Sequence, residues 1–146
     1  MQMPRLSLCI LLAFCFIGQP GCSRDPDQVA RQALVTAWKS AHASGDTEAM
    51  LALFCWDGVE EADRAFIRQS VMADFDLPVE SVQVVPLGKN ADFAYDFEGK
   101  RYVPNLTPVA QLEVVFANAE RMHVRHPLGS KDWQYLLINP RPQVSE

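Results

Sequence analysis

The sequence lacks the short motifs that mark most catalytic and metal sites. It contains no Cys-x-x-Cys pair, no cluster of histidine and cysteine, no phosphate-binding glycine loop, no Gly-x-Ser-x-Gly and no Ser/His/Asp arrangement. These absences argue against a zinc site and against the nucleotide-binding and hydrolase classes that such motifs mark. We therefore expect neither a metal nor a cofactor.

The chain is also short of positive charge. Its 146 residues carry 13 Lys and Arg against 18 Asp and Glu, a formal net charge of −5. Residues 1–21 contain Arg5 and no acid, so the remainder carries 12 basic and 18 acidic side chains, or −6. Such a surface repels phosphates, so nucleic acid is not an expected partner. The hydrophobic fraction of 49% is that of one globular domain with appendages.

The apolar run near the N-terminus is too short for a comfortable membrane span. It extends from Leu6 to Gly18, whereas a spanning helix needs about 20 residues. Arg5 precedes the run, and Gly21-Cys22 follows it. A positive residue, an apolar core and a small residue before a cysteine resemble a bacterial lipoprotein signal.

We predict that residues 1–21 are a signal peptide and that residues 22–28 form a tether with lipid on Cys22. The protein would then lie in the cell envelope, anchored to a bacterial membrane and facing the periplasm or the exterior. Gln19 and Pro20 depart from the usual pattern. Ordinary secretion and an uncleaved anchor therefore stay open.

Only two of the four cysteines, Cys22 and Cys55, lie outside the predicted signal peptide. If Cys22 carries lipid, Cys55 is unpaired in an oxidising compartment and burial has to protect its thiol. If Cys22 is not lipidated, a Cys22–Cys55 disulfide becomes feasible. The two interpretations exclude each other.

The first half of the domain is predicted to be helical. Asp25 can cap a first helix, Pro26 suits its first position, and Gly45 suits its left-handed end. Its apolar residues recur at three- and four-residue spacing, with Trp38 as the largest. They are Ala30, Ala33, Leu34, Ala37, Trp38 and Ala41.

Two further helices are predicted. Asp46 caps the second, from Thr47 to about Phe54, and Asp57 begins the third, which runs to about Phe75. The inward face of the third helix is predicted to comprise Val59, Ala62, Phe66, Ile67 and Val71.

From Glu80 onward the hydrophobic period changes to two, which indicates strands. The predicted strands include 93–97, 100–103, 109–117 as the longest, 121–128 and 133–138. Turns are expected at Glu98-Gly99 and at 129–132, and a frayed tail over 139–146. A tight turn after residue 117 places Glu113 opposite Arg125 and Val115 opposite His123.

This order of elements gives an α+β fold in which three N-terminal helices pack on a strongly curved antiparallel sheet. It resembles the nuclear-transport-factor-2-like superfamily over residues 29–138. The resemblance implies a cone whose concave sheet face meets the helices around a pocket. One departure is that only residues 55–58 separate the second and third helices, where a short strand or hairpin is usual. The matching residues are Ala37-Trp38, Ala41, Gly45-Asp46, Ala49 and Leu53-Phe54.

Enzymes of that superfamily use a pocket Asp, His or Tyr for proton transfer, so the resemblance implies two candidate catalytic residues. Asp57 follows apolar Phe54 and Trp56, and burial there would raise its pKa. Its alternative role is the cap of the third helix. Tyr95 would donate a hydrogen bond to a ligand carbonyl, or pack as a core aromatic.

Candidate ligand-binding residues are Trp38 and Trp56, which either line a pocket or pack in the core. His123 and Arg125 belong to a basic row that either binds an anionic group or forms a solvated face opposite Glu113. His126 lies on the other face of the same strand, which argues against a paired metal site.

Three functions follow from these candidates. The first is a non-enzymatic, membrane-tethered lipoprotein that binds a small apolar ligand or a partner protein. The second is an enzyme of the isomerase, dehydratase or cyclase type that uses Asp57 and Tyr95. The third is a structural module that forms a homodimer through an exposed sheet face.

Overall fold

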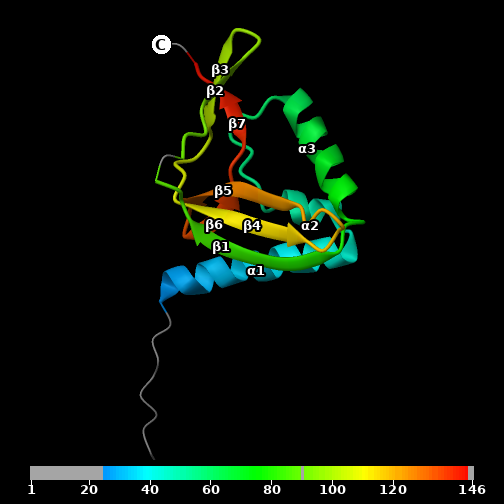
Figure 1. The fold of residues 1–146 in the computed structure, drawn as a ribbon. Coiled ribbons are helices and arrows are strands. Elements are labelled where there is room, and N and C mark those ends of the chain that lie inside the picture. The colour runs from blue at the N-terminus through cyan, green and yellow to red at the C-terminus, as the bar shows by residue number, and fades with distance from the viewer. Residues whose placement is uncertain (1–24, 90, 145–146) are drawn as a thin grey trace, which may run out of the picture.

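The computed structural model describes residues 25–89 and 91–144. Within these residues, three helices come first and seven strands follow (Figure 1). The elements are α1 (Pro26–Ser44), α2 (Thr47–Leu51), α3 (Glu61–Asp74), β1 (Val79–Pro86), β2 (Tyr95–Phe97), β3 (Lys100–Pro104), β4 (Ala110–Phe116), β5 (His123–Lys131), β6 (Gln134–Leu137) and β7 (Pro140–Pro142).

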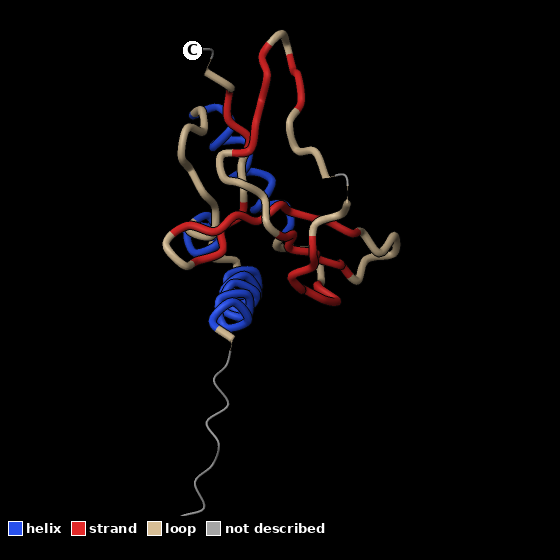
Figure 2. Tube along the Cα trace, turned by 90° about the vertical axis from the view of Figure 1, so that its left-hand side faces the viewer, coloured by secondary structure: helices blue, strands red, loops and turns tan. Residues whose placement is uncertain are grey.

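The strands form two antiparallel sheets. One has the order β1-β4-β5-β6 and curves strongly, and the other has the order β2-β3-β7. Helix α1 runs along one face of the four-stranded sheet, as the end-on view shows (Figure 2). Helix α3 and the three-stranded sheet both rise above the four-stranded sheet (Figure 1). The predicted α+β class, with helices against a curved antiparallel sheet, is confirmed.

Helix α1 has the predicted ends. The Asp25 carboxylate accepts a hydrogen bond from the Asp27 amide at 3.0 Å, and Gly45 ends the helix with φ 63°. Because the helix begins at Pro26, residues 26–28 belong to the folded domain and not to the predicted tether. Its buried face consists of Leu34, Val35, Trp38 and Ala41.

The central strands provide the other side of the core. Leu112, Val114 and Phe116 of β4 are buried, together with Leu128 and Leu137 from the neighbouring strands. These side chains pack against Trp38 of α1. The amphipathic helix therefore finds its apolar partner in the concave face of the sheet.

The predicted register is confirmed, because Glu113 lies opposite Arg125 and Val115 opposite His123. The prediction that this pair lies on a solvated face is wrong for Glu113. Glu113 is only 8% exposed, because it lies on a central strand. Its carboxylate is 3.4 Å from Arg125 Nη2 and 3.6 Å from His123 Nδ1. The Arg125 guanidinium supplies the opposite charge, since an unpaired carboxylate at this depth is costly.

The second helix is shorter than predicted. It ends at Leu51, and the chain then makes a single parallel bridge between Phe54 and Leu137. Cys55 N–H donates to the Leu137 carbonyl at 2.8 Å, and Leu137 N–H donates to the Leu53 carbonyl at 2.8 Å. These tertiary hydrogen bonds replace the helical bonds of the predicted last turn.

The third helix differs from the prediction at its start and in its packing. Asp57 does not cap it, because the cap residue is Glu60 and no side chain bonds to the first turn. No residue of α3 is buried, and Phe66, predicted to face inward, is 69% exposed. Only Val71 and the following Phe75 pack against the core.

The last hairpin corrects the predicted turn at 129–132. Gly129 lies inside β5, where a Cβ would stand 2.5 Å from the Leu106 Cβ, so close packing explains this glycine. The turn is Asp132-Trp133, with φ 51° and 64°. Strand β5, not β4, is the longest. Residues 139–142 are not frayed either, because Asn139 is buried and β7 pairs with β3.

Replacing Trp133 should stabilise the fold. A left-handed backbone is unfavourable for a bulky side chain, and the indole, 93% exposed, gains no burial in return. Asparagine adopts this conformation at lower cost, so Trp133→Asn should raise the free energy of unfolding by about 1 kcal/mol in urea denaturation. An unchanged or lower value would contradict this explanation.

Candidate functional site

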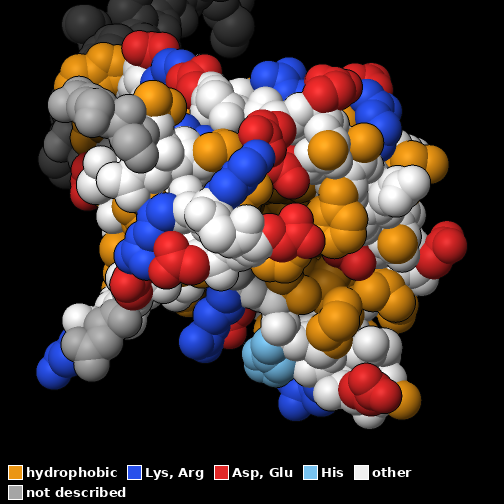
Figure 3. Space-filling view, turned by 90° about the horizontal axis from the view of Figure 1, so that it is seen from above, with side chains coloured by type: hydrophobic (Ala, Val, Ile, Leu, Met, Phe, Trp, Pro, Cys, Tyr) orange, Lys and Arg blue, Asp and Glu red, His pale blue; other side chains and the backbone are white. Residues whose placement is uncertain are grey.

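A small apolar cleft lies between α3 and the sheet. Its volume is about 280 Å³. From above, hydrophobic side chains gather in a hollow of this face (Figure 3). We call it the α3 cleft. Its lining residues are Trp38, His42, Met50, Phe54, Phe66, Ile67, Ser70, Val71, Asp74, Phe75, His126, Ile138, Asn139 and Pro140.

The cleft exists because α3 stands off from the sheet. Ile67, Ser70, Val71 and Asp74 recur at three- and four-residue spacing and therefore share one face of α3. This face lines the cleft instead of closing on the β6–β7 segment, and none of its residues is fully buried. An apolar helix face that lines an open cavity is a usual feature of a ligand site.

His126 is a polar group inside this apolar cleft. It lies opposite Leu112 on the concave face of the sheet, and its ring meets the Phe54 ring edge-on at 6.5 Å. Burial lowers the pKa of His126 below its ordinary value of 6.5. The neutral imidazole therefore predominates near pH 7, and in this form one ring nitrogen can donate and the other can accept a hydrogen bond.

Acidification should destabilise the fold through His126. Because its pKa is lower in the folded state, the unfolded chain binds the proton first as the pH falls. The stability that the fold has while His126 is neutral is fully present above pH 6.5, and it is lost as the pH falls toward the folded-state pKa. Between about pH 7.5 and about pH 5.5, wild type should lose more stability than His126→Gln in urea denaturation. Equal losses would contradict the assignment.

A second histidine joins α1 to the end of α3. His42 stacks on Trp38 with ring centroids 5.0 Å apart, and its Nε2 lies 3.0 Å from the Asp74 carbonyl oxygen. Since a carbonyl only accepts, the imidazole donates this bond. Burial raises the pKa of the Asp74 carboxyl group, and nearby His42 partly offsets the shift. His42 is one of the site residues that no sequence pattern had marked.

Two asparagines hold the wall of the cleft. Asn105 Nδ2 donates to the carbonyl oxygens of Cys55 at 2.8 Å and Asp57 at 3.2 Å, and its Oδ1 accepts from the Asn139 amide at 3.1 Å. Asn139 Nδ2 also donates to Cys55 O, at 2.9 Å. This buried Asn105–Asn139 pair joins the α2–α3 connection to the β6–β7 junction. No sequence pattern marked either residue, because 104–108 reads as an ordinary loop.

The two candidate catalytic residues do not meet in the α3 cleft. Asp57 is exposed, and its carboxylate pairs with Lys131, whose hydrogen bond lowers the Asp57 pKa. The expected burial and raised pKa are therefore wrong. Tyr95 is 46% exposed and stacks on Tyr102 at 5.3 Å. Burial raises its pKa, with a further contribution from the Asp63 charge.

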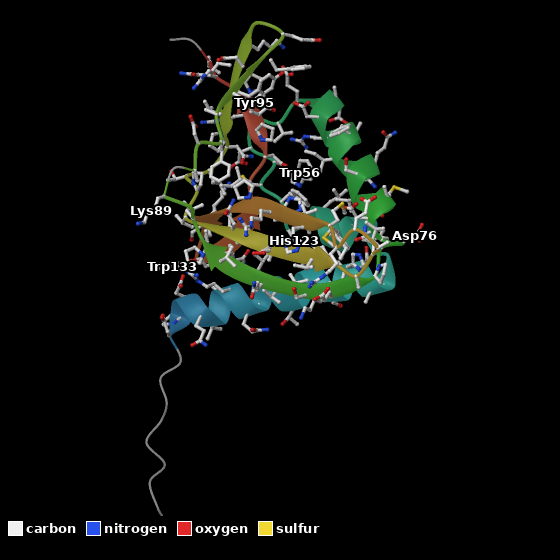
Figure 4. The ribbon with its side chains drawn as sticks, in the orientation of Figure 1. Trp56, Asp76, Lys89, Tyr95, His123 and Trp133 are labelled. Atoms are coloured by element: carbon white, nitrogen blue, oxygen red, sulfur yellow. The ribbon has the colours of Figure 1, made fainter. Side chains whose placement is uncertain are left out.

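Tyr95 instead borders a separate hollow on the raised three-stranded sheet (Figure 4). Phe93, Pro104 and Pro127 also line it. Ile138 and Pro140 line both this hollow and the α3 cleft, so the β6–β7 segment forms the wall between them.

Of the four predicted ligand-binding side chains, Trp38 lines the α3 cleft. Trp56 lies between α2 and α3 outside it, where its Nε1 donates to the Leu51 carbonyl at 2.9 Å and Arg64 stacks on its ring. His123 and Arg125 alternate with His126 along β5 and therefore lie on the opposite face of the sheet, beside Glu113. The structure therefore divides these four residues among three places.

Some predictions fall outside the described residues. The signal peptide and the lipidated Cys22 are among them. Cys55 is buried and forms no disulfide with a residue of 25–89 or 91–144. Over residues 25–89 and 91–144, no group of three or more His, Cys, Asp or Glu is arranged to hold a metal ion. Within the same ranges, no helix has the length and hydrophobicity needed to cross a bilayer.

No family model and no curated protein sequence matches the chain. Among solved structures, the chain is similar to the crystal structure of a Campylobacter jejuni protein that is named an NTF2-like transpeptidase. The TM-score is 0.37 and the identity 13%, over 77% of this chain and 96% of that chain. A likeness at this level assigns no family, so the superfamily resemblance stays a prediction. The described residues form an α+β fold in which helices and a curved antiparallel sheet line an apolar cleft.

Proposed function

We propose that this protein is a non-enzymatic binding module, tethered to a membrane, whose α3 cleft takes a small apolar ligand with one hydrogen-bonding group. The observation that carries the proposal is the position of the His126 imidazole in the lining of an otherwise largely apolar cleft. A cleft of about 280 Å³ lies at the lower end of ligand-pocket volumes. It suits a fused or single aromatic ring with a hydroxyl or carbonyl group.

The ligand proposal is tested by filling the cleft. Val71 lines the cleft, whereas the neighbouring Met72 points away and is more than half exposed. In calorimetric titrations with 2-naphthol, Val71→Trp should reduce affinity at least about tenfold, because its indole occupies the ligand volume. Met72→Trp, the matched control, should bind like wild type. Equal affinity in all three proteins would rule out the α3 cleft as the site.

The tether proposal rests on the N-terminal sequence and on the start of α1. Cys22 precedes Pro26 by four residues, which reach at most about 14 Å when extended. A lipid on Cys22 would therefore hold the domain close to the bilayer. The intact mass of membrane-extracted protein distinguishes a lipidated chain that begins at Cys22 from a Cys22–Cys55 disulfide and from unmodified protein. Only the first result supports the tether.

An isomerase-like activity is the second candidate, and the same histidine favours it. A neutral imidazole in an apolar cleft is suited to accept a proton, and a raised pKa makes the nearby Asp74 carboxyl group easier to protonate. This assignment replaces Asp57, which lies outside the cleft. An enzyme of this kind should exchange the α-protons of a bound cyclic enone with deuterated solvent, and His126→Gln should abolish the exchange. Binding without exchange leaves the non-enzymatic function.

A further inference from the structure

The tip of the β5–β6 hairpin carries an aromatic residue that the fold does not use. The turn joins Lys131 to Gln134 through Asp132 and Trp133, which both have positive φ. Such two-residue turns favour asparagine and glycine. Trp133 is nevertheless 93% exposed, so it neither suits the backbone nor packs in the core. No contact within residues 25–89 and 91–144 accounts for its presence.

The hairpin is fastened to the start of α1. The Tyr135 hydroxyl donates to the Asp27 carboxylate, and the Arg31 guanidinium lies 5.5 Å from the Tyr135 ring centre. Arg31 also pairs with Asp27 at 2.7 Å. Trp133 consequently lies at the end of the molecule where α1 begins (Figure 4). The hairpin tip and the predicted lipid attachment therefore belong to the same end of the domain.

We propose that Trp133 inserts into the interfacial region of the membrane to which the protein is tethered. This inference rests on the proposed tether. Indole rings favour the membrane interface, where the ring contacts apolar groups and the N–H stays hydrated. A single tryptophan binds a bilayer weakly, but a tether makes its contact intramolecular and raises its effective concentration. Two attachment points would fix the orientation of the domain, with the α3 cleft facing away from the bilayer.

The surroundings of Trp133 favour lipid over a protein partner. A stable protein interface buries about 800 Å² on each partner, whereas this tip presents one isolated aromatic ring. The adjacent Asp132, and Asp25 and Asp27 at the start of α1, would not attract anionic lipid. The contact is therefore apolar and should be insensitive to salt.

Quenching by brominated lipid tests the proposal. The full lipidated protein is reconstituted into vesicles of a zwitterionic phosphatidylcholine, with or without bromine on the acyl chains near the headgroup. Wild-type tryptophan emission should be quenched in the brominated vesicles, at low and high salt alike. Trp133→Asn, which suits the turn, should lose this quenching. Trp56→Phe, the matched control away from the hairpin, should keep it.

Flotation of the same vesicles separates this inference from the tether. Protein that floats but shows equal quenching in wild type and Trp133→Asn overturns the inference and leaves the tether intact. Protein that does not float overturns both. If Trp133→Asn instead converts a dimer to a monomer without a change in quenching, a second copy covers the indole, and the membrane contact is wrong.

Discussion

Trp38→Ala should lower the free energy of unfolding by about 3–5 kcal/mol, the range for removing a large aromatic side chain from a core. Trp38 is buried and packs against Leu112, Val114 and Phe116 of the central strand. It also stacks on His42, which hydrogen-bonds to the end of α3. The substitution therefore leaves a cavity between α1 and the sheet and frees one link to α3. Urea denaturation measures the loss.

Trp133→Ala is the matched control, since the same indole is removed from a position that is almost fully exposed. We expect its stability to change by less than about 0.5 kcal/mol or to increase. A loss of less than about 1 kcal/mol for Trp38→Ala would contradict the placement of the core between α1 and the concave sheet face. The α3 cleft, of which Trp38 is a lining residue, would then also need revision.

Asn105→Ala is the second substitution with a large expected effect, a loss of about 2–4 kcal/mol. It removes the donor to Asp57 O, a part-buried group, and the acceptor of the buried Asn139 amide. Cys55 O keeps its bond from Asn139. The cost comes from buried polar groups left unpaired, not from lost apolar contact.

A double-mutant cycle tests whether the Asn105–Asn139 pair acts as a unit. The combined Asn105→Ala and Asn139→Ala losses should be less than additive by about 1 kcal/mol or more, because both variants disrupt the same bonds. Gln32→Ala, on the exposed face of α1, is the control and should change stability by less than about 0.5 kcal/mol. Strict additivity, or a small effect of Asn105→Ala, would show that the pair is not a coupled network.

The two asparagines matter for function because they set the position of the cleft wall. Asn139 lies between Ile138 and Pro140, and all three line the α3 cleft. Loss of the pair should therefore affect ligand binding as well as stability. Trp38 of α1 has the same double role, because it belongs to the hydrophobic core and also lines the α3 cleft. If the α3 cleft binds the proposed ligand, affinity and stability should be coupled at these two points of the molecule.

The ends of α1 and the register of β4 with β5 could be predicted because both depend on local rules. Asp25 and Gly45 have side-chain and backbone properties that suit helix ends wherever they occur. The predicted tight turn after residue 117 sets the register of β4 with β5. The alternation of apolar and polar residues over 110–114 also disfavours a shift by one residue, which would exchange the two faces of the strand.

The candidate site could be predicted only in part for the opposite reason. The apolar neighbours of Asp57 predict a place in a pocket. In the structure its carboxylate instead pairs with Lys131, which is 74 residues away in the sequence. The Asn105–Asn139 pair joins three connections that are distant along the chain. Such contacts follow from the packing of whole elements, and no short pattern of residues reports them.

The sequence by itself determined the α+β class, the first helix and the antiparallel order of the central strands, because capping preferences and hydrophobic periodicity act over a few residues. Only the tertiary structure decided that α3 stands away from the sheet, that His126 rather than Asp57 enters the cleft, and that Trp133 is left exposed at the surface of the fold. These outcomes depend on which surfaces remain uncovered once α1 and β1–β6 have packed, and that is a property of the assembled molecule.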